Sequence, residues 1–195
     1  MTRSFKARLT AAAGGLTATL ALGLAAPSAQ AAMSVLGSAF AHDCYLAARY
    51  GKPLEFGLEA CDRAIDGEPL DRRDLAATFV NRGVILMQQR QFKSAQRDFE
   101  QALATLPKLG EAEVNLGGAM IAQHRYAEGI DQITRGLALT PEEPEKAFYN
   151  RALGYEGVDD MKSAYLDYLK ASQIKPDWAA PKTELARFTV STRTP

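Results

Sequence analysis

The sequence predicts an all-α fold, an α-solenoid built from repeated helix-turn-helix hairpins. The clearest hairpin spans residues 76–109, where two amphipathic runs are joined by a short polar turn. Small residues recur between large apolar residues along both runs, a pattern that lets two helices pack closely. Pro107 ends the second run, because proline cannot donate the backbone hydrogen bond that another helical turn requires.

The same unit is repeated along the chain. A small residue followed five positions later by proline recurs at Ala64 and Pro69, Ala102 and Pro107, Gly136 and Pro141, and Ala171 and Pro176. The prolines are 38, 34 and 35 residues apart. We therefore expect four units, 38–71, 76–109, 110–143 and 145–178, of which the first is divergent. A fixed period of this length is the sequence signature of a solenoid.

The order of large and small residues inside each unit resembles the tetratricopeptide repeat (TPR) family. The matching positions are Gly83, Leu86, Ala95 and Phe99, then Gly117, Met120, Gly129 and Ile133, then Ala152, Tyr155, Ala164 and Tyr168. The resemblance covers about residues 38–178. It implies a right-handed superhelix in which the first helix of each hairpin lines a concave side, where TPR proteins bind their partners.

The N-terminal stretch 1–31 has the features of a secretory signal peptide. A basic start with Arg3, Lys6 and Arg8 precedes an apolar run, and Ala29-Gln30-Ala31 is a small-x-small site that predicts cleavage after about Ala31. An uncleaved membrane anchor is the alternative, although the run is rich in Gly and Thr. Cleavage predicts an exported protein without membrane insertion, in a bacterial periplasm or, alternatively, secreted.

The remaining chain is expected to be one TPR domain, residues 32–190, followed by a disordered tail, 191–195. A capping helix at about 179–189 would cover the apolar face of the last hairpin, as solenoid ends require.

Charge and motif content argue against several functional classes. The chain has 23 Lys and Arg and 23 Asp and Glu, and without the basic leader its net charge is near −3. Nucleic-acid binding is not expected, because it requires clustered basic residues. His42 and His124 stand alone, without the spacing of metal ligands, and no catalytic motif is present. We expect no enzyme, no cofactor and no metal.

The two cysteines, Cys44 and Cys61, fall at positions that face each other inside a TPR hairpin. In an exported protein with one possible pairing, this indicates a disulfide. It would close a loop of about 17 residues and contribute roughly 3 kcal/mol. A redox pair is the alternative, but catalytic dithiols usually stand as C-x-x-C.

The candidate partner-binding residues come from the inward offsets of the first helices. They are Val80, Asn81, Val84, Val114, Asn115, Lys146, Tyr149, Asn150 and Leu153. The apolar members would form an exposed strip along the groove. The three asparagines share one offset, and their amides could hold the backbone of an extended peptide or only bridge neighbouring helices.

Arg82 and Arg151 share another offset, and we expect their stems to cover apolar surface with the charged heads in water. The function expected from this pattern is a non-enzymatic scaffold that binds a peptide segment of a partner protein. The alternative is a self-associating structural subunit, a homodimer whose grooves pack together.

Overall fold

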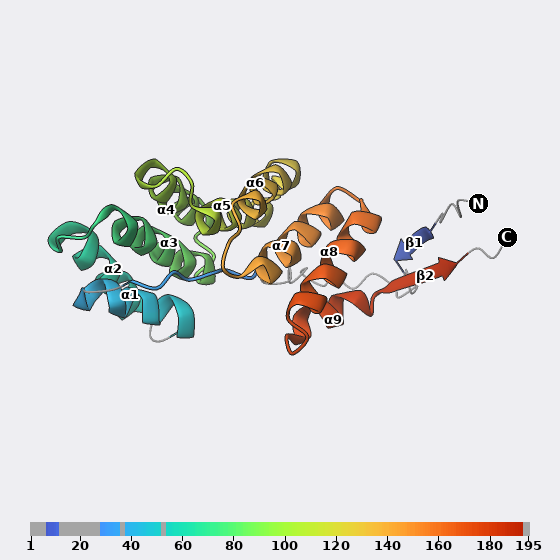
Figure 1. Cartoon of the computed structure of the whole chain (residues 1–195), viewed down its shortest axis with the longest axis horizontal. Coiled ribbons are helices and arrows are strands. Elements are labelled where there is room, and N and C mark those ends of the chain that lie inside the picture. The colour runs from blue at the N-terminus through green and yellow to red at the C-terminus, as the bar shows by residue number, and fades with distance from the viewer. Residues whose placement is uncertain (1–6, 12–27, 36–37, 52–53, 193–195) are drawn as a thin grey trace.

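The computed structural model describes residues 7–11, 28–35, 38–51 and 54–192. Within these ranges, helical hairpins follow one another along an elongated molecule (Figure 1). The hairpins are α1 (Ala39–Tyr50) with α2 (Leu54–Gly67), α3 (Arg72–Gln88) with α4 (Phe92–Thr105), α5 (Gly110–Ala122) with α6 (Tyr126–Ala138), and α7 (Pro144–Gly157) with α8 (Met161–Ile174). The expected α-solenoid of helical hairpins is therefore observed.

Small residues set the close approach of the two helices in a hairpin. A Cβ atom added to Gly117 of α5 would lie 2.5 Å from Ile133 Cγ1 and 2.7 Å from the carbonyl oxygen of Gly129 on α6. Gly83 of α3 is equally close to the ring of Phe99 on α4. Because real Cβ atoms do not approach other atoms so closely, these glycines are required by the packing and not by their backbone angles.

A residue with positive φ occurs in the turn inside each hairpin, among the residues that the structure describes. These residues are Gly51, Arg90, His124 and Asp159, with φ of 62°, 60°, 63° and 62°. Only the first is glycine, the residue that adopts this conformation without strain. Arg90, His124 and Asp159 each stand two residues after the first helix of their hairpin, so the last three hairpins share a turn although its sequence varies.

The C-terminal end differs from the sequence expectation. Helix α9 (Ala179–Leu185) packs on α8 but ends four residues before the expected end at 189. Strand β2 (Phe188–Thr192) follows and pairs antiparallel with β1 (Ala7–Ala11), so residues 191 and 192 of the expected tail are ordered in a strand. Thr189, Val190 and Thr192 are β-branched, which favours an extended backbone over another helical turn.

Other expectations lie outside the described residues. Most of the predicted signal peptide, 1–6 and 12–27, and the end of the predicted tail, 193–195, are in this group. Among the described residues, no helix is both long and apolar enough to span a bilayer.

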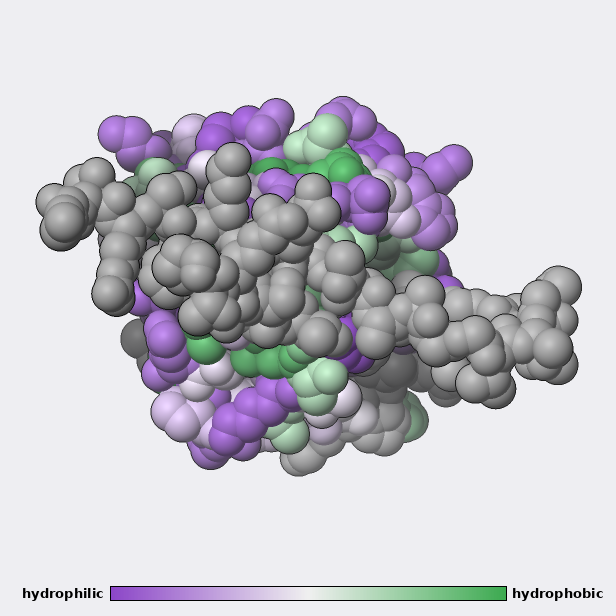
Figure 2. All heavy atoms as spheres, turned by 90° about the vertical axis from the view of Figure 1, so that its right-hand side faces the viewer, coloured by the Kyte–Doolittle hydropathy of each residue, from purple (hydrophilic) through white to green (hydrophobic). Residues whose placement is uncertain are grey.

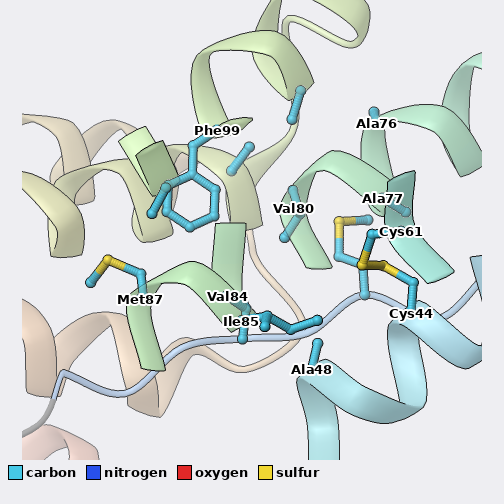
Figure 3. Close-up of a cluster of buried hydrophobic side chains, with 14 of the residues drawn as sticks. Cys44, Ala48, Cys61, Ala76, Ala77, Val80, Val84, Ile85, Met87 and Phe99 are labelled. Carbon is cyan, nitrogen blue, oxygen red and sulfur yellow. A yellow bond between two sulfur atoms is a disulfide. The ribbon is translucent and has the colours of Figure 1, made fainter. Parts of the chain in front are cut away.

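A continuous apolar core joins the first hairpins and contains the cysteine pair. Cys44 of α1 and Cys61 of α2 form a disulfide, and both are fully buried (Figure 3). Val80, Val84 and Ile85 of α3 pack in the same cluster. The first hairpin therefore contributes a covalent link to a core in which it otherwise supplies mainly alanines.

Candidate functional site

An extended segment of the chain itself, residues 28–35, lies along the first helices of the hairpins. It runs beside α3, α5 and α7 as the blue trace in Figure 1, from the α7 end towards α1. It has no helical or strand structure of its own. The close-up in Figure 3 shows this trace, in pale blue, passing α3 near the labelled Val84 and Ile85. We call this the groove segment.

The three asparagines hold the groove segment by its main chain. Each side-chain amide accepts a hydrogen bond from the N–H of one residue and donates one to the C=O of the same residue. The pairs are Asn150 with Ala29 (2.8 and 2.6 Å), Asn115 with Ala31 (3.3 and 2.9 Å) and Asn81 with Met33 (both 2.7 Å).

This geometry matches the periodicity of an extended chain. The N–H and C=O of one residue point to the same edge of a strand, and every second residue presents the same edge. The partners of the asparagines are every second residue, 29, 31 and 33. Each amide therefore occupies the place of a neighbouring strand, and successive hairpins engage successive two-residue steps.

Burial of the three asparagines makes an unpaired amide group costly, so the groove favours an occupant that offers both an N–H and a C=O at each step. The three asparagine side chains are almost completely buried. Among the described residues, no buried side-chain nitrogen or oxygen lacks a hydrogen-bond partner. An occupant without a free N–H or C=O at these steps would leave an amide unpaired, at a cost of about 1–3 kcal/mol for each group.

Lys146 adds a charged contact to the same segment. Its Nζ donates to the carbonyl oxygen of Gln30 at 2.8 Å and lies 2.7 Å from a carboxylate oxygen of Glu143. The lysine on α7 thus binds the carbonyl that lies between the Asn150 and Asn115 steps. Four polar side chains from three hairpins therefore converge on one stretch of main chain.

A comparison against protein families agrees with the fold. Residues 86–147 match a family model described as tetratricopeptide repeat. The chain contains tetratricopeptide repeats. The matched residues include most of the second and third hairpins, which carry the regular repeat pattern. A search of curated proteins found no match.

Solved TPR structures share this architecture at low sequence identity. The TPR domain of OM64 from Arabidopsis is 15% identical, with a TM-score of 0.55 over 60% of this chain and 96% of that one. MamA from Desulfovibrio magneticus RS-1 is 17% identical, with a TM-score of 0.57 over 76% and 82%. Another MamA crystal structure is 20% identical, with a TM-score of 0.56 over 70% and 77%. These similarities show the fold alone.

The apolar residues expected along the TPR groove do not form an exposed strip. Val80 and Val84 are buried in the core cluster that also contains Met33 and Val35 of the groove segment. Val114 points into its own hairpin, where a Cβ atom on Gly136 would lie 2.7 Å from its Cγ2. Figure 2 shows one end of the molecule, where hydrophilic residues line the outer edge and hydrophobic ones show nearer the centre.

Tyr149 and Leu153 of α7 are also part of the packing. The Tyr149 ring lies 5.4 Å from the ring of Tyr168 and 5.0 Å from that of Trp178, and it is nearly inaccessible. This burial raises the pKa of Tyr149 to about 12. Leu153 is half-buried beside the same cluster. Tyr149 thus supports the groove from below, and Ala29 packs against its cluster.

The two arginines expected to point into water are paired instead. Arg82 donates two hydrogen bonds to Asp98 of α4, at 2.9 and 2.7 Å, and Arg151 donates two to Asp167 of α8, at 2.7 and 3.0 Å. The bond to Asp98 raises the pKa of Arg82. Both aspartates lie 16 residues after their arginine. This repeated spacing is the sequence signal from which the arginine–aspartate pairing could have been predicted.

The hairpin of α5 and α6 has other residues in place of this ion pair. Leu116 stands at the arginine offset and Gln132 at the aspartate offset, and the amide of Gln132 donates to Glu113. The arginine–aspartate pairs therefore belong to the hairpin interiors and not to the groove. Among the described residues, no three His, Cys, Asp or Glu side chains gather closely enough to hold a metal ion.

Proposed function

We propose that this protein is a non-enzymatic interaction module of the cell envelope that binds an extended segment of a partner protein in its concave groove. The observation that carries the proposal is the paired bonding of Asn81, Asn115 and Asn150 to the main chain of the groove segment. A surface that binds a strand of its own chain in this way has the chemistry to bind a strand of another.

Because the groove would bind a partner segment by its main chain, the extended conformation of that segment matters more than its sequence. An added strand obtains its affinity from backbone hydrogen bonds and its specificity from the pockets for alternate side chains. A partner segment must therefore be extended and free of proline at the bonded residues. Many sequences meet these conditions, which suits a scaffold that holds an unstructured part of a larger protein.

The envelope location is supported by two features of the chain. The N-terminal residues have the charge, apolar run and small-x-small site of a secretory leader. The buried Cys44–Cys61 disulfide is of the structural kind that persists in oxidising compartments.

A capture experiment tests the groove. The protein, expressed from its full sequence with a C-terminal tag, is recovered from the envelope of expressing cells together with its bound proteins, beside the Asn81→Ala/Asn115→Ala/Asn150→Ala variant. Gln101→Ala/Gln173→Ala, which alters exposed amides on α4 and α8, is the matched control.

The proposal expects a captured protein that is lost with the asparagine variant and retained with the control. Capture that is unchanged in the asparagine variant would place binding elsewhere and overturn it. The alternative, a self-associating subunit, predicts no captured foreign protein and a dimer in light scattering that dissociates in the same variant.

A further inference from the structure

From Ala31 to Val35, buried side chains of the groove segment alternate with less buried ones. Ala31, Met33 and Val35 are buried, whereas Ser34 between the last two is exposed. Ala29, one step earlier, packs against the Tyr149 cluster. The residues whose main chain bonds to the asparagines are thus also those whose side chains face the protein. The groove therefore contacts the side chain of every second residue of its occupant.

The space for these side chains differs along the groove. At the Asn150 and Asn115 steps the occupant presents only methyl groups. The residue at the Asn115 step, Ala31, is only 5% exposed even with this small side chain. At the Asn81 step it presents Met33, which enters the large core cluster beside the first hairpin. Because protein interiors are close-packed, a longer side chain at residue 31 would have to displace neighbouring helices.

Gly118 of α5 lies beside the groove segment near the Asn150 step. A Cβ atom added to Gly118 would lie 3.4 Å from Asn150 Nδ2 and 3.5 Å from Gln30 Nε2. Gly118 therefore faces the groove segment, unlike Gly117 beside it, which faces α6. A side chain at residue 118 would therefore meet the Asn150 amide and the Gln30 side chain of the groove segment, and glycine at this position leaves that space to the occupant.

We propose that the groove binds extended segments that have alanine-sized side chains at the two residues facing Asn150 and Asn115 and a larger apolar side chain facing Asn81. In the uncleaved chain, residues 28–35 occupy the groove and compete with such segments. This rests on the proposed function and narrows it to a class of partner sequence. The segment is tethered close to its site, where effective concentrations are about millimolar, so a free peptide binds the intact chain only weakly.

The test uses the full chain and a labelled peptide with the sequence of residues 28–35. Ala29→Pro/Ala31→Pro removes the two N–H groups that donate to Asn150 and Asn115 and leaves the groove unchanged. Ala32→Pro/Ser34→Pro places the same number of prolines one residue out of step and is the matched control. Fluorescence anisotropy measures the affinity of each chain for the peptide.

We expect the Ala29→Pro/Ala31→Pro chain to bind the peptide at least roughly tenfold more tightly than the wild type, and the control to resemble the wild type. A peptide with leucine at both alanine positions should lose about tenfold in affinity. Equal binding by all three chains, or equal binding of both peptides, would overturn the inference.

Two further measurements separate this inference from the proposed function. If the asparagine-to-alanine triple variant loses the peptide while the prolines have no effect, the groove binds the peptide but residues 28–35 do not compete for it. If the triple variant keeps the peptide, the proposed function itself fails. Should the proline chain not fold, hydrogen exchange of residues 28–35 in the wild type decides, because excess peptide must accelerate it.

Discussion

The Arg82–Asp98 pair shows how a partly buried charge is accommodated inside a repeat. The guanidinium forms two parallel bonds with Asp98 and a third with Asp62 of the preceding hairpin, at 2.7 Å. Arg151 repeats this arrangement with Asp167 and, at 3.1 Å, Thr134 of the preceding hairpin. Each arginine therefore connects the two helices of its own hairpin and the hairpin before it.

Removing one partner of this pair should cost more than removing both. In Asp98→Ala, Arg82 loses two bonds in a site where its side chain is only 24% exposed. We expect a loss of about 1–3 kcal/mol in the free energy of unfolding. The double variant Arg82→Leu/Asp98→Ala, which leaves no unpaired charge there, should recover part of it. Urea unfolding of both chains checks this, and additive losses would contradict the pairing.

Neighbouring glycines on helix α5 separate folding from binding. Gly117 meets Ile133 and the backbone of α6, whereas Gly118 meets only the Asn150 amide and the groove segment. A leucine at residue 117 must push the two helices of the hairpin apart. A leucine at residue 118 must instead fill the groove. The same substitution at adjacent positions thus addresses two properties of one helix.

We expect Gly117→Leu to abolish cooperative thermal unfolding, and Gly118→Leu to retain it while losing peptide and partner capture. Circular dichroism during heating and fluorescence anisotropy with the residue 28–35 peptide measure the two effects. Retained peptide binding in a folded Gly118→Leu chain would show that the groove is not where the ligand lies.

The helices could be predicted from the sequence because their signals recur. Glycine, alanine and proline at fixed offsets specify where two helices meet and where they end, and three asparagines at one offset must share a face. The groove segment has no comparable signal, because eight residues of extended chain have no helical period. It also lies partly within the predicted leader, so the sequence places Ala29 and Ala31 outside the folded domain.

The remaining differences have local causes. Val114 and Tyr149 were expected in the groove because they share one offset with Val80. Each of the three directly precedes one of the asparagines. Side chains at this offset can point either into the hairpin or into the groove, and Gly136 leaves space that Val114 fills. Periodicity identifies the helix face, but the size of the opposing residue decides which way a side chain turns.

At the scale of the whole molecule, stability is a sum over neighbouring hairpins. The first hairpin has one neighbour, and α1 buries only three alanines and Cys44. Its disulfide therefore compensates for a small apolar contact at the end of the solenoid. The opposite end is covered by α9 and by the ring of Trp178 against Tyr149.

We expect Cys44→Ala/Cys61→Ala to lower the free energy of unfolding by about 3 kcal/mol, the value for a loop of this length. The loss should be concentrated in α1 and α2, where amide hydrogen exchange would accelerate first. Thermal unfolding with and without reductant provides the comparison, because the variant must be insensitive to reductant. Uniform acceleration across all hairpins would contradict a local role.

The groove segment also crosses the predicted cleavage position. Cutting after Ala31 would detach the residues bound to Asn150 and Asn115 and leave Met33 on Asn81. It would also place a new α-ammonium group at Ala32, inside the groove beside Asn115. Export and acquisition of a vacant binding surface would then be a single chemical event, and a precursor retained in the cytoplasm would be unable to engage partners before it reached them.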